Sequence, residues 1–149
     1  MSTIKSYFRK HNPKLPSYIA NDNASNIGEN DGVYNKAGRG MPDVSANGLT
    51  LASFINGTQD CSDGPQIGTS IWAAVVTLIN QQRTKAGKGP VGFINPALYA
   101  NPWMMNETVG GSNANCGSAW FEAVPVEDPV SGLGTPKYPK LVKYFLSCK

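Results

Sequence analysis

The chain is poor in charge, in histidine and in cysteine, and it has no long apolar run. Only 15% of its 149 residues are charged, and the formal net charge of +3 is too small and too dispersed to favour a nucleic acid partner. No stretch approaches the roughly 20 apolar residues of a membrane span, and residues 1–10 are too polar for a signal peptide. We therefore expect no nucleic acid partner, no membrane partner and no export signal within this chain.

The chain has only one histidine and three cysteines, the residue types on which many catalytic and metal sites depend. His11 closes a Lys- and Arg-rich segment, and a single histidine without a placed partner is more often a surface residue. Cys61, Cys116 and Cys148 cannot all pair with one another, and their spacing matches no metal-binding pattern. A bridge from Cys116 to either of the other two stays open.

Turn-forming residues are abundant, because 16 Gly and 11 Pro indicate long irregular connections around a modest core. The length indicates one domain, residues 1–149. Apolar periodicity predicts five elements. They are an N-terminal helix ending before Pro13, a mostly buried strand over 49–55 followed by an Asn56-Gly57 turn, a central helix after Ser70, a short helix over 96–99, and a terminal helix after Pro139. This order fits one flank of an α/β sandwich.

The central helix carries the strongest periodic signal. Its predicted apolar stripe, with Trp72 at the margin, consists of Ile71, Ala74, Val75, Leu78 and Ile79. Gly87 suits a left-handed cap at its end. Ser70 lies at the mouth of this helix, where unpaired N–H groups and the positive end of the helix dipole suit both an N-cap and a nucleophile. On local sequence alone, the N-cap is the favoured interpretation.

Four motifs follow one another in a fixed order. They are residues 40–46 (GMPDVSA), 68–70 (GTS), 92–99 (GFINPALY) and 128–136 (DPVSGLGTP). From about Gly38 to about Lys143, the chain resembles the C-terminal part of the catalytic domain of the sedolisin family, the serine-carboxyl peptidases. This resemblance implies an α/β fold, namely the C-terminal portion of a subtilisin-like three-layer fold with long loops.

The resemblance implies that Ser70 is the nucleophile and Asp43 the oxyanion-hole donor for hydrolysis of peptide bonds. A carboxyl group can donate a hydrogen bond only while protonated, so such a site is expected to work at acid pH. Without the resemblance, an Asx-type turn is the simpler interpretation of Asp43 after Pro42. In the family, a Glu and an Asp serve the nucleophile, and this pair is missing here, because no Glu is followed by an Asp four residues later. The chain has four glutamates, and the sequence around each is typical of a loop: Glu29, Glu107, Glu122 and Glu127.

A second departure concerns the helix itself. Family members usually carry a small-residue stretch ending in Pro after Gly-Thr-Ser, whereas here Ser70 runs straight into Ile71. About four residues are missing, or roughly one helical turn and 6 Å of rise. The apolar face stays nearly in phase, but the serine moves by about a turn, and catalytic geometry tolerates roughly 1 Å. We expect a helix that folds around a misplaced serine.

The resemblance also implies one bound Ca²⁺. Its expected ligands are the side chains or carbonyl groups of Glu107, Thr108, Val124, Val126 and Asp128. Calcium takes roughly six to eight oxygen ligands, so carbonyl groups of any residue type serve. Glu107 stands where the family has Asp, and its extra methylene moves the carboxylate by about a bond length. The alternative is two exposed carboxylates in loops.

Two functional hypotheses follow. The first is a fragment, or an incorrectly assembled gene product, of a secreted acid-acting endopeptidase or tripeptidyl peptidase, whose peptide or protein substrate is cleaved once upstream sequence supplies the missing base pair. The second is a catalytically inert secreted glycoprotein domain with a calcium-binding loop. An extracellular location is implied by the resemblance and supported by three glycosylation triplets, which begin at Asn23, Asn56 and Asn106. In both cases we expect no activity from this chain alone.

Overall fold

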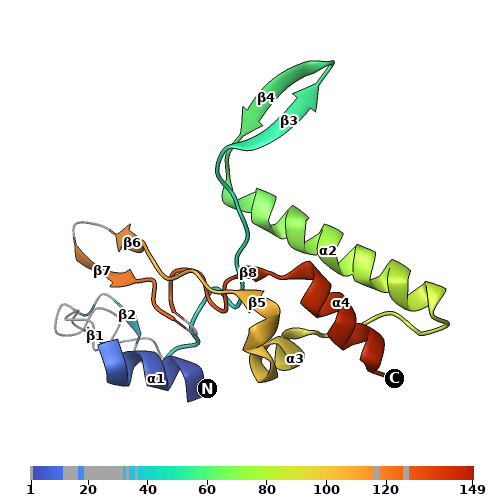
Figure 1. Ribbon diagram of the computed structural model, residues 1–149. Helices are drawn as coiled ribbons and strands as arrows, with labels where there is room; N and C mark the ends of the chain where they lie inside the picture. The colour runs from blue at the N-terminus through green and yellow to red at the C-terminus, as the bar shows by residue number, and fades with distance from the viewer. Residues whose placement is uncertain are drawn as a thin grey trace, which may run out of the picture. The chain divides into compact units, whose positions relative to one another are not determined.

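The computed structural model describes residues 2–11, 17–18, 32, 34–35, 37–115, 118–125 and 128–149. The chain forms two compact units, of which unit 1 is Met1–Asp43 with Thr108–Gly132 and unit 2 is Val44–Glu107 with Leu133–Lys149. Helices and small two-stranded sheets make up both units (Figure 1). The expected mixture of α and β structure is confirmed at this level.

Unit 1 contains one helix and two small sheets. Helix α1 spans Ser2–His11, as the spacing of its apolar residues predicts. Strands β1 (Ser17–Tyr18) and β2 (Tyr34–Asn35) pair in parallel, and β6 (Ser112–Asn115) and β7 (Ser118–Glu122) pair antiparallel. Glu122 is the last residue of β7, so the expectation of loop surroundings for it was wrong.

Unit 2 contains the other elements. A hairpin of β3 (Leu51–Ile55) and β4 (Thr58–Ser62) precedes helix α2 (Pro65–Lys85). Helix α3 (Asn95–Ala100) and the 3₁₀ helix η2 (Pro102–Met104) follow, then β5 (Met105–Asn106), which pairs with β8 (Thr135–Pro136), and finally α4 (Tyr138–Ser147). The predicted short and terminal helices are confirmed. Among the described residues, no helix combines the length and the apolar character needed to cross a bilayer.

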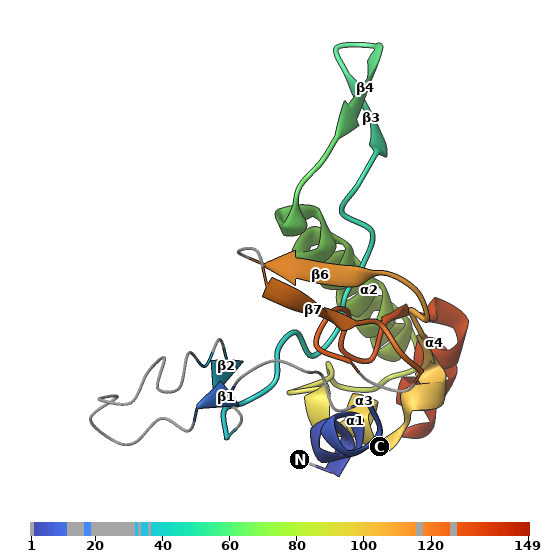
Figure 2. The ribbon, with the colours of Figure 1, turned by 90° about the vertical axis from the view of Figure 1, so that its left-hand side faces the viewer.

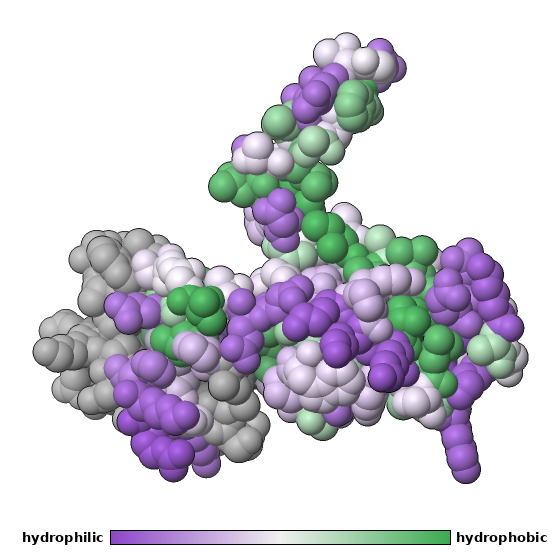
Figure 3. Space-filling model, viewed as in Figure 1, coloured by the Kyte–Doolittle hydropathy of each residue, from purple (hydrophilic) through white to green (hydrophobic). Residues whose placement is uncertain are grey.

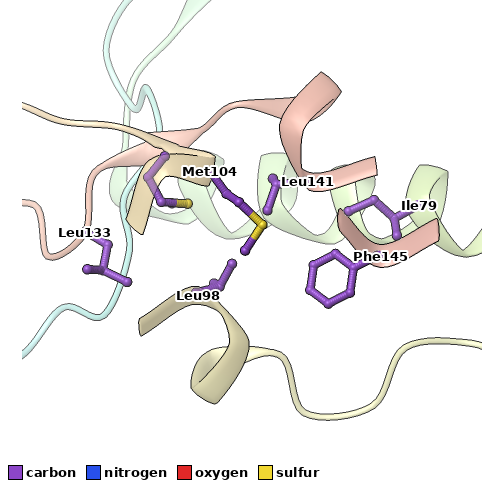
Figure 4. Packing of buried hydrophobic residues seen from close by; sticks show 7 residues of the cluster. Ile79, Leu98, Met104, Leu133, Leu141 and Phe145 are labelled. Carbon is purple, nitrogen blue, oxygen red and sulfur yellow. The ribbon is translucent and has the colours of Figure 1, made fainter. Parts of the chain in front are cut away.

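The core of unit 2 lies where α2, α3, η2 and α4 meet (Figure 4). Leu141 and Phe145, four residues apart on α4, present one face of that helix to the cluster. The remaining buried members of the cluster are Ile79, Leu98, Met104, Met105 and Leu133. Burial of these side chains is the main source of stability for the unit.

The buried face of α2 is rotated from the predicted stripe. Val75 and Ile79 face the core as expected, but Leu78 is 45% exposed and Ala74 is also exposed. Trp72 packs against the core and Arg83 is buried. Both side chains donate to backbone carbonyl oxygens of distant segments, and periodicity in apolar residues cannot reveal such pairings.

Arg83 holds the C-terminal end of α4 in place. Its Nε donates to the Gly89 carbonyl oxygen at 2.6 Å, and its Nη1 donates to the carbonyl oxygen of Phe145. Its guanidinium also reaches the carbonyl oxygens of Cys148 and Lys149, at 3.3 and 3.1 Å. The Phe145 carbonyl lies in the last turn of α4, where a helix leaves carbonyl groups without helical partners, and the other acceptors are also backbone carbonyls. Backbone oxygens therefore satisfy the N–H groups of this buried guanidinium.

The hairpin corrects the expected buried strand. Strand β3 is exposed at four of its five positions, because the β3–β4 hairpin extends away from α2 in both views (Figures 1 and 2). The turn is confirmed: Asn56 and Gly57 both have positive φ, at 51° and 80°, as a two-residue type I′ turn requires. Strand β4 was missed because its sequence, TQDCS, has no apolar alternation.

In unit 1, the turn over residues 128–132 packs tightly on the backbone of Pro42 and Asp43. Asp128 and Gly132 form a bridge, and Gly132 has φ 63°. A Cβ at Gly132 would overlap the Asp43 carbonyl group and come within 2.5 Å of the Pro42 carbonyl oxygen. Only glycine fits here, for both steric and conformational reasons.

We expect Gly132→Ala to destabilise the chain by about 2 kcal/mol or more, because the new methyl group collides with backbone and the residue keeps positive φ. Equilibrium unfolding in urea measures the loss. Gly92→Ala is the matched control, since a Cβ there meets no atom within 4 Å. Equal effects of the two substitutions would contradict the packing of this turn.

Candidate functional site

Residues of three sequence motifs converge on the segment Val44–Ala46 of unit 2. The Ser45 N–H donates to the Gly134 carbonyl oxygen at 2.9 Å, and the Ser45 carbonyl oxygen accepts from the Trp72 indole Nε1 at 2.8 Å. A Cβ on Gly68 would lie 3.6 Å from the Ala46 carbonyl oxygen. The structure therefore brings motifs 40–46, 68–70 and 128–136 together through backbone contacts around Ser45.

The fourth motif, residues 92–99, has a structural part in the same unit. The carbonyl oxygen of Ile94 accepts the N–H groups of Ala97 and Leu98, at 2.9 and 3.1 Å, and so starts α3. Leu98 is fully buried in the core cluster. This motif positions a core residue.

Ser70 lies inside α2 and not at its mouth. The helix begins at Pro65, whose fixed φ suits the first helical position, and Gly64 occupies the N-cap position. The Ser70 Oγ is exposed and donates to the Gln66 carbonyl oxygen at 3.3 Å, one turn back in the same helix. The N-cap interpretation of Ser70 is therefore wrong.

Asp43 forms an ion pair on the surface of unit 1. Its carboxylate accepts a hydrogen bond from the guanidinium of Arg39, and the two side chains are 21% and 61% exposed. Such a pair contributes about 1 kcal/mol at most. In this pair the Asp43 carboxylate accepts a hydrogen bond, whereas a carboxyl group in an oxyanion hole must donate one to the oxyanion. Asp43 belongs to unit 1 and Ser70 to unit 2.

Asp128 is the best-held carboxylate among the expected calcium ligands. It is 4% exposed, and its Oδ1 accepts the backbone N–H groups of Val130 and Ser131 at 2.8 and 2.7 Å. Among the described residues, the contacts of its Oδ2 are longer, at 3.3 Å to the Val124 N–H and the Ser131 hydroxyl. The alternative of an exposed carboxylate is wrong for Asp128.

The other expected ligands are divided between the units. Thr108 and Val124 belong to unit 1 with Asp128, exposed Glu107 belongs to unit 2, and Val126 lies outside the described residues. Within the described part of the chain, no three His, Cys, Asp or Glu side chains cluster to hold a metal. A cation at Asp128 would therefore depend on carbonyl oxygens, which suit calcium, and the Oδ2 atom retains capacity for it.

Unit 1 also contains an aromatic pocket of about 230 Å³ that sequence reasoning missed. Tyr7 and Phe8 of α1 line it together with Tyr34 and Phe121, whose rings contact one another at centroid distances of 5.3–6.3 Å. Burial raises the pKa of Tyr7, whose hydroxyl donates to the Glu122 carbonyl oxygen at 3.3 Å. In the sequence, Tyr7 and Phe8 indicated only the periodicity of a helix. The pocket could not be predicted from them, because Tyr34 and Phe121, which complete it, are distant in the sequence.

Two of the three cysteines are free thiols in the structure. Cys61 is exposed on β4, and Cys148 is partly buried at the end of α4. Cys116 lies outside the described residues, so the alternative of a bridge from it to one of them stays open.

Comparison with known proteins shows which class of protein this chain resembles. No family model matches the chain. It is 46% identical over 143 residues to aorsin from Aspergillus oryzae and 42% identical over 144 residues to tripeptidyl-peptidase sed1 from Aspergillus fumigatus, covering 96% and 97% of this chain. Physarolisin from Physarum polycephalum is 33% identical over 119 residues, which is 74% of this chain.

These similarities identify the family of the chain. By them the chain belongs to the sedolisin family, which confirms the resemblance carried by its motifs. The matched region is 22% of the length of aorsin and of sed1, and 21% of physarolisin. The chain thus spans about a fifth of the relatives it matches.

We expect Ser70→Ala to change the free energy of unfolding by less than about 0.5 kcal/mol, because its exposed hydroxyl bonds only within its own helix. Loss of an N-cap would instead cost about 1 kcal/mol. Trp72→Phe serves as the comparison, since it removes the indole bond to Ser45 and should cost roughly 1–3 kcal/mol. A larger loss in Ser70→Ala than in Trp72→Phe would contradict the described helix start.

Proposed function

We propose that this chain is the C-terminal segment of a secreted, acid-acting serine-carboxyl peptidase that hydrolyses peptide or protein substrates, and that it is inactive alone. The carrying observation is the gathering of three family motifs around Ser45, in a chain similar to peptidases over nearly its whole length. The proposal includes a subtilisin-like arrangement once the upstream part is present, and an extracellular location.

In this proposal Ser70 attacks the scissile carbonyl and Asp43, in its protonated form, donates to the oxyanion. Two observations support the proposal that the chain alone is inactive. No Glu–Asp pair with four-residue spacing is present to accept the proton of Ser70. The Ser70 hydroxyl donates to the Gln66 carbonyl, and the Asp43 carboxylate accepts from Arg39, so both groups are engaged in other contacts.

The same two contacts favour the alternative of an inert secreted glycoprotein domain. Such a domain would keep the backbone contacts around Ser45, because these contacts do not involve the Ser70 hydroxyl or the Asp43 carboxylate. It would also bind a cation at Asp128. The alternative differs from the peptidase proposal in one respect that can be measured, namely whether Ser70 can act when an upstream segment is supplied.

We expect the purified chain to hydrolyse no peptide substrate from acid to neutral pH, because a nucleophile without its base retains only residual catalysis. Acid hydrolysis that disappears in Ser70→Ala would overturn this expectation.

The sharper test is a chimera in which this chain replaces the matching C-terminal segment of aorsin. We expect the chimera to be at least about 100-fold less active than aorsin, because α2 carries Ser70 about a turn away from its place. Inserting about four small residues after Ser70 should restore activity, and Ser70→Ala should abolish it again. A folded but inactive insertion variant would favour the inert domain.

We further propose that one Ca²⁺ binds through Asp128 with carbonyl oxygens of its unit, including Thr108 and Val124, and with Glu107 and Val126 as the remaining family positions. When bound, the ion would supply a fixed positive charge that ties the 128–132 turn to neighbouring loops. The buried Asp128 carboxylate supports this proposal, because the contacts of its Oδ2 with described residues are long, at 3.3 Å.

We expect calcium at roughly a hundredfold above its Kd to stabilise the folded chain by about 2.7 kcal/mol, and magnesium to do much less. Thermal melts with calcium, magnesium and chelator measure this difference. Glu107→Gln should weaken the effect, and Asp128→Asn should remove it. An equal calcium shift in Asp128→Asn would show that the ion binds elsewhere.

A further inference from the structure

The tip of the β3–β4 hairpin presents an N-glycosylation triplet in an open turn. Asn56 and Gly57 form the two-residue loop, since Ile55 pairs with Thr58 in the strand register. Asn56, Gly57 and Thr58 are all exposed, and a Cβ at Gly57 would meet no atom within 4 Å. The amide of Asn56 is therefore accessible to a bulky modifying group.

The other triplets are less suited or lie outside the described residues. Asn106 is part of β5 and pairs with Thr135 of β8, and Thr108 is only partly exposed. Asn106 is exposed, as Asn56 is, so its place in a paired strand is what separates the two sites. Asn23 lies outside the described residues. The structure thus distinguishes Asn56 from Asn106.

Apolar side chains next to Asn56 are left uncovered. Phe54, two residues before the asparagine, is 74% exposed, and Ile55 is 58% exposed. Apolar surface is visible on the hairpin in the space-filling view (Figure 3). An exposed aromatic ring beside a turn is a surface on which the C–H face of a sugar ring can pack, and apolar patches of this kind mark interaction sites.

We propose that Asn56 is N-glycosylated and that the first sugar of the glycan packs on Phe54. The inference rests on the extracellular location in the proposed function, but not on peptidase activity. In the reaction, the Asn56 Nδ2 forms a bond to C1 of a lipid-linked diphospho-oligosaccharide. The C1–O bond to the diphosphate breaks, the amide loses one proton, and the lipid diphosphate leaves.

The site is tested by directing the full chain through the secretory pathway of a eukaryotic host behind that host's leader, and by mass analysis of the peptide that contains Asn56. We expect Asn56 to carry a glycan that is lost in Asn56→Gln and retained in Asn106→Gln. An unmodified Asn56 in the secreted protein would overturn the proposal. The chimera assay is independent of this result, so the two proposals can fail separately.

The sugar–Phe54 contact is tested by a double-mutant cycle of Asn56→Gln and Phe54→Ser in the same host. Because Phe54 is exposed, Phe54→Ser should fold normally. We expect glycan loss to lower Tm by roughly 2–4 °C more when Phe54 is present than in the Phe54→Ser background. An equal Tm change in both backgrounds would show that the glycan does not contact Phe54.

Discussion

The backbone of Ser45 is the contact on which the arrangement of the motifs depends. Its N–H and its carbonyl oxygen are bonded to different segments, Gly134 and the indole of Trp72. A backbone group buried without a partner costs free energy, so both bonds must form together when these segments pack. The segment is therefore held between α2 and the residues that follow the 128–132 turn, through groups that every amino acid carries.

Glycines complete this arrangement because they let backbones approach closely. Gly132 leaves room for the Asp43 carbonyl in unit 1, and in unit 2 Gly134 leaves room for the Asn106 carbonyl. In contrast, the Ser45 hydroxyl is buried with no hydrogen-bond partner among the described residues, which costs about 1–3 kcal/mol. The Ser45 hydroxyl therefore adds no hydrogen bond with a described residue to the two that its backbone makes.

Helices α1 to α4 could be predicted from sequence because each has an apolar face or a Pro or Gly signal at an end, whereas the short helix η2 was not predicted. The Leu141 and Phe145 pair of α4 and the Gly87 cap of α2 are examples. The start of α2 could not be predicted from its apolar residues, because the helix begins at Pro65, before the stripe does. The exposure of β3 also required the structure, since a run of apolar residues does not reveal whether other elements cover it.

The candidate site could also be predicted only in part. The motifs identified Ser70 and Asp43, but they did not identify the groups to which these side chains are hydrogen-bonded. Arg39 beside Asp43 and the Gln66 carbonyl beside Ser70 are such partners. The contacts around Ser45 use backbone groups, glycines and one indole, and none of them involves the Ser70 hydroxyl or the Asp43 carboxylate. These contacts therefore do not depend on the side chains of the proposed catalytic residues. In motifs 40–46 and 68–70, the atoms that make these packing contacts differ from the hydroxyl and carboxyl groups of the proposed catalytic role, so the packing can be retained without that role.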